Sequence, residues 1–340
     1  DVKTVFDDDP EIPRGVSFEE IQLGAFLSEE ITPSDWAALL AHTAKRMETG
    51  ESRGIVVGHG TDTLAYTSSL MYWFFADAEI PIVLTASAVP SDGGGRGEAV
   101  ANLRRSIRTA ASGEKGIHVV YGGNDFQPLN LKFERADYTP VPREDFERVS
   151  ATGGDGTDYY HGAFRNWNPE AIGRTGRPLG RNARTLPVGE LSRRLEDAIG
   201  RTFIAKVYPG MRGETLIALM DAGITNFVLE IYDTGTANLR ETPFSLKKAL
   251  AHGRERGVLF FCTSQQEGVV DFSEYVTAHQ LWREGAIPMG ALTTESVWTR
   301  LVTAHVEAAI SMNISWDDGE RDDVRDRFNE HVLRLMEDNE

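Results

Sequence analysis

The sequence predicts an α/β protein with two domains: a larger N-terminal domain with a mostly parallel sheet and flanking helices, and a smaller C-terminal α/β domain. Short apolar runs alternate with amphipathic helical stretches along most of the chain, which is typical of parallel sheets covered by helices. The chain has 340 residues, enough for about two domains of roughly 150 residues each. Its composition, 41% hydrophobic and 26% charged, is that of a folded globular protein.

The individual elements are predicted from local signals. Thr32 can cap a helix, Pro33 suits the first helical position, and Asp35 sits where a capping-box acid belongs. Further helices are predicted over residues 63–75 and 293–305. Each predicted strand is a short apolar run followed by turn residues. In chain order these runs are residues 54–57, 82–85, 116–121, 203–207, 226–230 and 258–262.

The domain boundaries are predicted from a loss of periodicity between about residues 150 and 194, where Gly, Pro, Arg and Asn dominate. Near the end, Val324, Phe328, Val332 and Leu335 recur at helical spacing, so an amphipathic terminal helix is expected. The predicted organisation is an N-terminal α/β domain over 1–150, an irregular connection over 151–194, a C-terminal α/β domain over 195–315 and a charged terminal helix over 316–340.

Charge and cysteine content exclude several classes of function. A net charge of −17, from 52 acidic and 35 basic residues, would repel phosphate backbones and anionic lipid, so nucleic-acid and membrane partners are disfavoured. No run approaches the roughly 18 apolar residues of a membrane helix, and no signal-peptide pattern is recognised, so a cytoplasmic protein is expected. The single cysteine, Cys262, excludes an intramolecular disulfide and a Cys-based zinc cluster, and its apolar surroundings predict a buried structural thiol.

The sharpest local motif is VVGHGTDTL, residues 56–64. An apolar strand ends there in a Gly-flanked turn that carries a hydroxyl and a carboxylate at the start of a helix. Ligands bind at the carboxyl ends of strands in open α/β sheets, and the helix N-terminus offers N–H donors. Thr61 and Asp62 could therefore hold a small polar or zwitterionic molecule.

The same residues also have a purely structural interpretation. Thr61 or Asp62 could instead cap the helix that follows. His59, alone beside two glycines, is typical of a packed or turn residue, and no second histidine stands nearby at metal-ligand spacing. The sequence therefore predicts no metal site.

Together with its surroundings, HGTDT at 59–63 resembles the L-asparaginase family. Further segments resemble this family in the same order, and they extend over about residues 16 to 305. Residues 27–29 and the Tyr66-Thr67 pair are similar to the archaeal tRNA-dependent amidotransferase subunit of that family. The matching segments are LSEEITPSDW at 27–36, PIVLTAS at 81–87, Asn102-Leu103, GTANL at 235–239, Ser264-Gln265 and 293–301.

The resemblance implies roles for five residues. Thr61 would be one of two family threonines at the reacting carbonyl, and Asp62 would bind the α-ammonium group of the substrate. Ser28 would hold the α-carboxylate, and Glu29 stands where the family often has a Gln that touches the ammonium. Asn238 matches an Asn that reaches the site across a dimer interface, which implies a homodimer or homotetramer.

A catalytic lysine is also implied, and Lys132 is the only lysine in the expected region after the strand ending at Tyr121, one residue short of the expected spacing. A lysine kept near neutral by burial could serve as the base for a threonine hydroxyl. Alternatively, Lys132 is a surface lysine whose stem packs along apolar neighbours. Residues 122–125, GGND, depart from the usual family sequence.

The family's primary nucleophile, a threonine on a first strand, has no match in the chain and is expected upstream of Asp1. The segment ATGGDGT at 151–157 is superficially similar, but it follows no buried strand, so a flexible Gly-rich turn is the competing interpretation. Residues 97–100, GEAV, replace the family's usual Ser-Asp-Gly-Pro.

The leading hypothesis is an amidohydrolase of asparaginase type that releases ammonia from L-asparagine or a related amide through a Thr nucleophile, without a cofactor. One alternative is an inactive asparaginase-like protein that binds a small molecule or a partner. Another is an amidotransferase subunit that supplies ammonia to a partner acting on tRNA.

Overall fold

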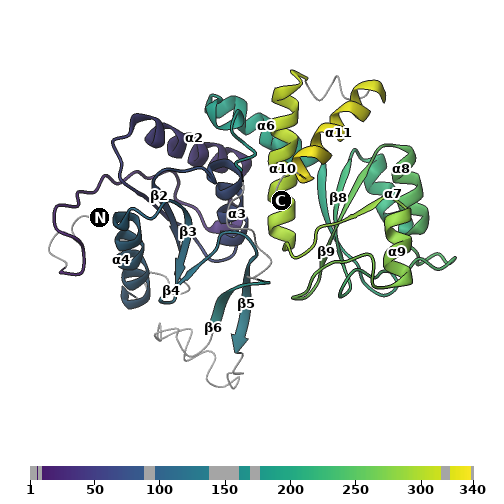
Figure 1. Cartoon of the computed structure of the whole chain (residues 1–340), viewed down its shortest axis with the longest axis horizontal. Helices are drawn as coiled ribbons and strands as arrows, with labels where there is room; N and C mark the ends of the chain where they lie inside the picture. The colour runs from purple at the N-terminus through teal and green to yellow at the C-terminus, as the bar shows by residue number, and fades with distance from the viewer. Residues whose placement is uncertain are drawn as a thin grey trace.

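The computed structural model shows two α/β domains side by side (Figure 1). No helix within the described residues is both long and apolar enough to cross a membrane. The structure describes residues 6, 10–87, 96–137, 161–168, 177–314 and 322–337.

The N-terminal sheet has the strand order β1-β2-β3-β4, in which the first three strands are parallel and the last is antiparallel. All five residues of β2 are buried because helices cover the sheet, as parallel sheets require. The strands are β1 (Ile55–Gly58), β2 (Pro81–Thr85), β3 (Gly116–Tyr121) and β4 (Asn124–Phe126), and the helices are α2 (Pro33–Thr49), α3 (Leu64–Phe75) and α4 (Arg96–Ser112).

A two-stranded antiparallel hairpin, β5 (Leu131–Asp137) with β6 (His161–Asn166), follows this sheet. It corrects the sequence analysis, which expected an irregular connection throughout 151–194. Strand β6 offers few apolar residues, so its pattern does not stand out. Its buried Phe164 stacks edge-on against Tyr121, with 4.9 Å between ring centroids, and this contact attaches the hairpin to the sheet. The ATGGDGT segment lies outside the described residues.

The C-terminal sheet is fully parallel, with the strand order β10-β9-β8-β7. The six strands predicted from apolar runs are confirmed as β1, β2, β3, β7, β8 and β9. Elements of this domain are β7 (Thr202–Lys206), β8 (Asn226–Ile231), β9 (Leu259–Ser264), β10 (Ala286–Pro288), α7 (Gly213–Asp221), α8 (Lys247–Glu255) and α9 (Val276–Arg283).

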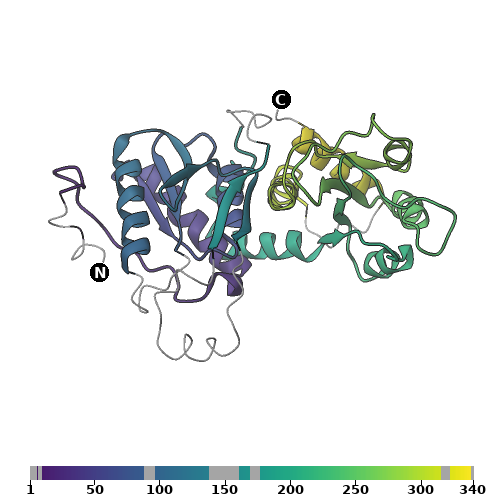
Figure 2. The same ribbon diagram turned by 90° about the horizontal axis from the view of Figure 1, so that it is seen from below.

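Three helices join the two domains. The long helix α10 (Thr294–Ser311) is buried along most of its length, packs against α3 of the N-terminal domain, and contacts β7, β8 and β9. Helix α6 (Val188–Gly200) packs against both α2 and α10, and Figure 2 shows it bridging the space between the domains. Helix α11 (Asp322–Glu337) lies against α10, with Val324, Phe328 and Val332 buried. One apolar core therefore extends from the N-terminal sheet to α10 and α11.

Candidate functional site

The turn after β1 and the segment before α2 meet at the carboxyl end of the N-terminal sheet. The Thr63 hydroxyl donates to the Ser28 carbonyl at 2.8 Å. A Cβ on Gly60 would lie 2.5 Å from Ser28 Oγ, so this contact requires glycine at position 60. Ser28 is buried in a short 3-10 helix, η1 (Ser28–Glu30). The structure thus brings Ser28 next to the turn that carries Thr61 and Asp62.

The side chains of Thr61 and Asp62 in this turn are accessible to solvent. Thr61 is half-buried, while Asp62 and the neighbouring Glu29 are exposed. Helix α3 has Thr63 as its N-cap residue. Among the described residues, neither the Thr61 nor the Asp62 side chain forms a hydrogen bond or ion pair. Helix capping therefore does not account for these two residues, and none of the described residues competes with a ligand for either side chain.

The ends of the neighbouring strands are held together by Asn102, from one of the segments that resembles the family. Its Nδ2 donates to the Ala86 carbonyl at 2.9 Å, and its Oδ1 accepts from Gly122 N at 3.0 Å. Just before it, in the segment that departs from the family sequence, Glu98 accepts a hydrogen bond from the Ser87 hydroxyl at 2.9 Å. These contacts fix the edge of the sheet beside the turn.

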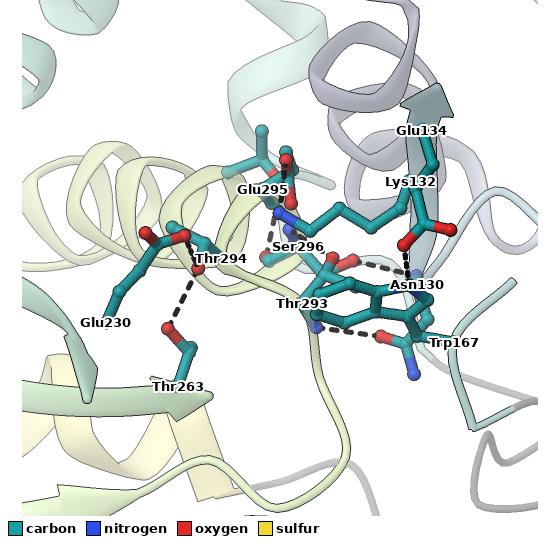
Figure 3. A network of polar contacts seen from close by, with 11 residues as sticks. Asn130, Lys132, Glu134, Trp167, Glu230, Thr263, Thr293, Thr294, Glu295 and Ser296 are labelled. Atoms are coloured by element: carbon teal, nitrogen blue, oxygen red, sulfur yellow. Dashed lines mark hydrogen bonds and ion pairs between the residues drawn. The ribbon is translucent and has the colours of Figure 1, made fainter. Parts of the chain in front are cut away.

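Lys132 lies at a different place, the junction between the two domains (Figure 3). Its Nζ is 2.8 Å from Oε1 of Glu295 in the first turn of α10. Both side chains are mostly buried, with 16% and 14% exposed, and the ammonium lies 5.0 Å from the centre of the Trp167 ring. Lys132 is therefore not a surface lysine, and within the described part of the chain it forms no hydrogen bond or ion pair with Thr61 or Asp62.

Asn130 connects the hairpin to the start of α10 (Figure 3). It is fully buried with a φ of 57°, in the left-handed region that Asn tolerates better than most residues. Its N–H donates to Ser296 Oγ at 3.1 Å, its Nδ2 donates to the Ala291 carbonyl at 2.8 Å, and its Oδ1 accepts from Thr293 N at 3.1 Å. The residue that precedes the Lys132 strand is thus pinned to the C-terminal domain.

The remaining groups of the junction are acidic or hydroxylic. Thr294 donates a hydrogen bond to Glu230 Oε1 at 2.6 Å and also contacts Thr263 Oγ1 at 2.9 Å. Burial, followed by the nearby carboxylates of Glu295 and Glu230, raises the pKa of Tyr66 on α3. Tyr66 lies in the first turn of α3, and α3 packs against α10, so the start of α3 lies at this junction.

Asn238 is in neither of these places. It is exposed in the loop after β8, where Nδ2 donates to the Phe244 carbonyl at 2.9 Å and Oδ1 accepts from Arg240 N at 3.1 Å. It lines a pocket of about 360 Å³ at the carboxyl ends of β7 and β8. The other lining residues are Val207, Tyr208, Pro209, Gly210, Met211, Tyr232, Phe244 and Leu246. No group of three or more potential metal ligands occurs among the described residues.

Comparisons with known proteins agree with the motifs. Residues 1–132 match the family described as asparaginase, N-terminal. A glutamyl-tRNA(Gln) amidotransferase subunit from Aeropyrum pernix is 29% identical over 96% of this chain and 73% of its own length. The N-terminal part of the chain is thus similar to the asparaginase family. The Pyrococcus furiosus protein of the same name is 27% identical over 86% of this chain, which covers 63% of that relative.

Solved structures place the whole chain in the asparaginase fold. The thermostable L-asparaginase from Thermococcus kodakarensis superposes with a TM-score of 0.63 at 22% identity, covering 96% of this chain and 86% of that one. L-asparaginase I from Vibrio cholerae gives 0.64 at 19% identity, covering 94% and 86%. At these identities the likeness establishes a two-domain α/β fold.

Sequence reasoning missed the partners of Lys132. Glu295 lies in a segment that resembles the family, yet nothing in its spacing indicates a lysine partner 163 residues away. The available signal is its position in the first helical turn, where a carboxylate is favoured by the helix dipole. Trp167 and Asn130 carry no sequence signal, because the hairpin that places them was not predicted.

Proposed function

We propose that this chain, which is similar to the asparaginase family, is an amidohydrolase that hydrolyses the side-chain amide of L-asparagine or a related amide and releases ammonia through a Thr nucleophile. The observation that carries the proposal is the approach of Ser28 to the Thr61–Asp62 turn at the carboxyl end of β1. A buried hydroxyl, a half-buried hydroxyl and an exposed carboxylate there offer complementary contacts for an amino acid. The start of α3 adds positive potential that suits a carboxylate.

In this proposal Thr61 acts at the reacting carbonyl, and Asp62 binds the α-ammonium group. Ser28 holds the α-carboxylate, and Glu29 adds a second carboxylate near the ammonium. The hydrolysis has two steps, acyl transfer to a threonine and then to water, and both need a base within hydrogen-bond reach. Lys132 is the proposed catalytic lysine. The Lys132 Nζ is paired with Glu295. This ion pair must therefore open, or other groups of the junction must pass a proton to it, before Lys132 can serve as the base for the Thr61 hydroxyl.

The proposal includes a homodimer or homotetramer, in which Asn238 completes the site of a second subunit. Two exposed apolar surfaces support this. Phe26 and Leu27, 42% and 64% exposed, directly precede Ser28. Tyr208 and Phe244, 57% and 46% exposed, line the pocket that also contains Asn238. Mutual burial of these surfaces would place Asn238 near a Ser28 site.

A second candidate function is that of an amidotransferase subunit that supplies ammonia to a partner acting on tRNA. The observation that favours it is the similarity to relatives that are named as subunits of glutamyl-tRNA(Gln) amidotransferase. The chain spans 63% to 73% of those two relatives, so their activity and partners remain proposals here. A catalytically inactive member that binds a small molecule or a partner is the third alternative.

The test is ammonia release from L-asparagine and L-glutamine by this chain, and by a version extended upstream to the native start. Asp62→Ala and Thr61→Ala should each lower turnover by at least about a hundredfold. The first removes the proposed contact with the α-ammonium group of the substrate, and the second removes the hydroxyl proposed to act at the reacting carbonyl. Asp221→Ala, at an exposed surface ion pair, is the matched control and should leave turnover unchanged. If both chains bind L-asparagine without releasing ammonia, the inactive alternative replaces this proposal. Release that depends on an added partner subunit would favour the amidotransferase.

A further inference from the structure

A chain of three hydrogen bonds runs from the interior of the N-terminal domain to the peptide that precedes Thr61. Trp36 Nε1 lies 2.9 Å from Thr67 Oγ1, which lies 2.9 Å from His59 Nε2. At the other side of the ring, His59 Nδ1 lies 2.8 Å from the Gly60 carbonyl oxygen. The chain joins α2, α3 and the turn after β1.

The chemistry of the groups sets the direction of each hydrogen bond. An indole N–H can only donate and a carbonyl can only accept. Thr67 Oγ1 therefore accepts from Trp36 and donates its own proton to His59 Nε2. The ring then carries its proton on Nδ1 and donates it to Gly60. A single neutral tautomer of His59 satisfies all three bonds.

The environment keeps this arrangement intact. Trp36 is 7% exposed and Thr67 is fully buried, so breaking either bond would leave a buried polar group without a partner. Burial also lowers the pKa of His59, against the opposing effect of its bond to the Gly60 carbonyl, and this keeps the ring neutral. Both ring nitrogens are occupied, so His59 is not free to exchange a proton with a substrate.

The last of the three hydrogen bonds, from His59 to the Gly60 carbonyl, fixes the peptide between Gly60 and Thr61. A trans peptide is planar, so holding its carbonyl also sets the direction of the Thr61 N–H, which points the opposite way. On its other side Gly60 is in close contact with Ser28. Because the Thr61 and Asp62 side chains form no hydrogen bonds within the described residues, their placement depends on this backbone.

We propose that His59, backed by Thr67 and Trp36, is a positioning residue that fixes the Gly60–Thr61 peptide and thereby places Thr61 and Asp62 for an amide substrate. The role in catalysis rests on the proposed function, whereas the role in ordering the turn does not. In this proposal the histidine of the HGTDT motif orients a backbone peptide, which is neither the role of a metal ligand nor that of a residue that only packs.

The test compares Thr67→Val with Thr67→Ser in the full chain. Valine keeps the shape of threonine but removes the hydroxyl, whereas serine keeps the hydroxyl. Amide hydrogen exchange at residues 60–62 of the ligand-free protein should accelerate about tenfold or more in Thr67→Val and stay near the parent rate in Thr67→Ser. Exchange in β3 should change little in either variant, which separates local loosening from global destabilisation.

The same pair of variants tests the catalytic part. For ammonia release from L-asparagine, Thr67→Val should lower kcat about tenfold with a smaller change in KM, and Thr67→Ser should restore most of it. If the parent chain releases no ammonia, the proposed function fails, but the exchange measurement still decides whether the chain of bonds orders the turn. If the turn loosens in Thr67→Val and kcat is unchanged, the catalytic part is wrong.

A direct observation covers the case in which Thr67→Val does not fold. Nitrogen-15 NMR of the parent protein should show His59 as the neutral tautomer protonated on Nδ1 at pH 7. A tautomer protonated on Nε2, or a ring that is charged, would overturn the proposal. In addition, His59→Asn, which keeps a donor near the Nδ1 position, should retain slower exchange at 60–62 than His59→Leu. Equal exchange in these two variants would also contradict it.

Discussion

The turn after β1 and the junction between the domains are both polar, but they differ in how far apart their residues lie in the sequence. The turn comes from one contiguous motif and from Ser28, which lies 35 residues before Thr63. The junction joins Lys132 to Glu295 across 163 residues, and it needs both domains in place. In the turn, the backbone places the Thr61 and Asp62 side chains, and the hydrogen bonds of His59 hold that backbone. In the junction, charges and buried hydrogen bonds do most of the positioning.

This difference predicts whether a substitution in each region affects mainly ligand binding or mainly stability. A change at the surface of the turn should disturb the proposed ligand site at a small cost in stability, because the Thr61 and Asp62 side chains are partly exposed. A buried polar junction should lose stability first, because each broken contact leaves a desolvated group without a partner. Four changes test the contrast.

Lowering the pH should reduce the unfolding free energy, and we expect His305 in α10 to cause the largest effect of the four changes. Burial, and then the charge of Arg201, lower the pKa of His305 from 6.5 to about 3. Between these values the unfolded chain binds a proton that the folded chain does not. The stabilising contribution is therefore complete above about pH 6.5 and is lost as the pH falls towards 3, by on the order of 5 kcal/mol in total.

Urea unfolding between pH 7.5 and 4.5 measures this loss. His305→Phe keeps a ring against Phe328, 5.1 Å away between centroids in the parent, and removes the titrating group. The variant should show a clearly smaller fall in unfolding free energy over this range. Parallel curves for the two proteins would show that His305 does not carry the acid sensitivity.

Asn130→Ala should lower the unfolding free energy by roughly 3 kcal/mol, because two side-chain hydrogen bonds to the C-terminal domain are lost and alanine is strained at a φ of 57°. Asn130→Gly is the matched control, since glycine accepts this φ but also lacks the amide. We expect glycine to be the more stable of the two by about 1 kcal/mol. A loss below about 1 kcal/mol for alanine would mean that the junction is not held by Asn130.

Glu295→Gln should lower the unfolding free energy by about 2 kcal/mol, because it leaves the mostly buried Lys132 ammonium without its carboxylate. The matched variant is Lys132→Met with Glu295→Leu, which replaces the whole pair by apolar groups and should recover most of the loss. If the double variant is as unstable as Glu295→Gln, the cost arises from altered packing of α10 and not from the unpaired charge.

The sequence allowed most of the sheet framework to be predicted, because the strands of the parallel sheets are short apolar runs with local turn signals. The start of α2 was predicted for a similar reason: the Thr32 N–H donates to Asp35 Oδ2 at 2.8 Å, which is a local contact. The β5–β6 hairpin was not predicted, since its order depends on aromatic packing such as that of Phe164 against Tyr121 and not on its own periodicity.

The candidate site divides in the same way. The proximity of Ser28 to the turn follows from segments that resemble the family. The setting of Lys132 could not be predicted, because its partners come from the hairpin and from α10. Neither spacing nor propensity relates those elements to each other. Asn238 illustrates a further limit, because the proposed contact with a second subunit cannot be read from the single chain, where the side chain is satisfied within its own loop.

Gly60→Ala should have the smallest effect on stability and a large one on ligand binding, which is the sharpest form of the contrast. The new Cβ would lie 2.5 Å from Ser28 Oγ and 2.7 Å from Ser28 Cβ, so η1 must move away from the turn at a cost of about 1 kcal/mol. Gly58→Ala is the matched control, since a Cβ there meets nothing within 4 Å. Calorimetric titration with L-aspartate should show binding lost in Gly60→Ala and kept in Gly58→Ala. If Gly60→Ala binds as the parent does, Ser28 and the turn do not form one site.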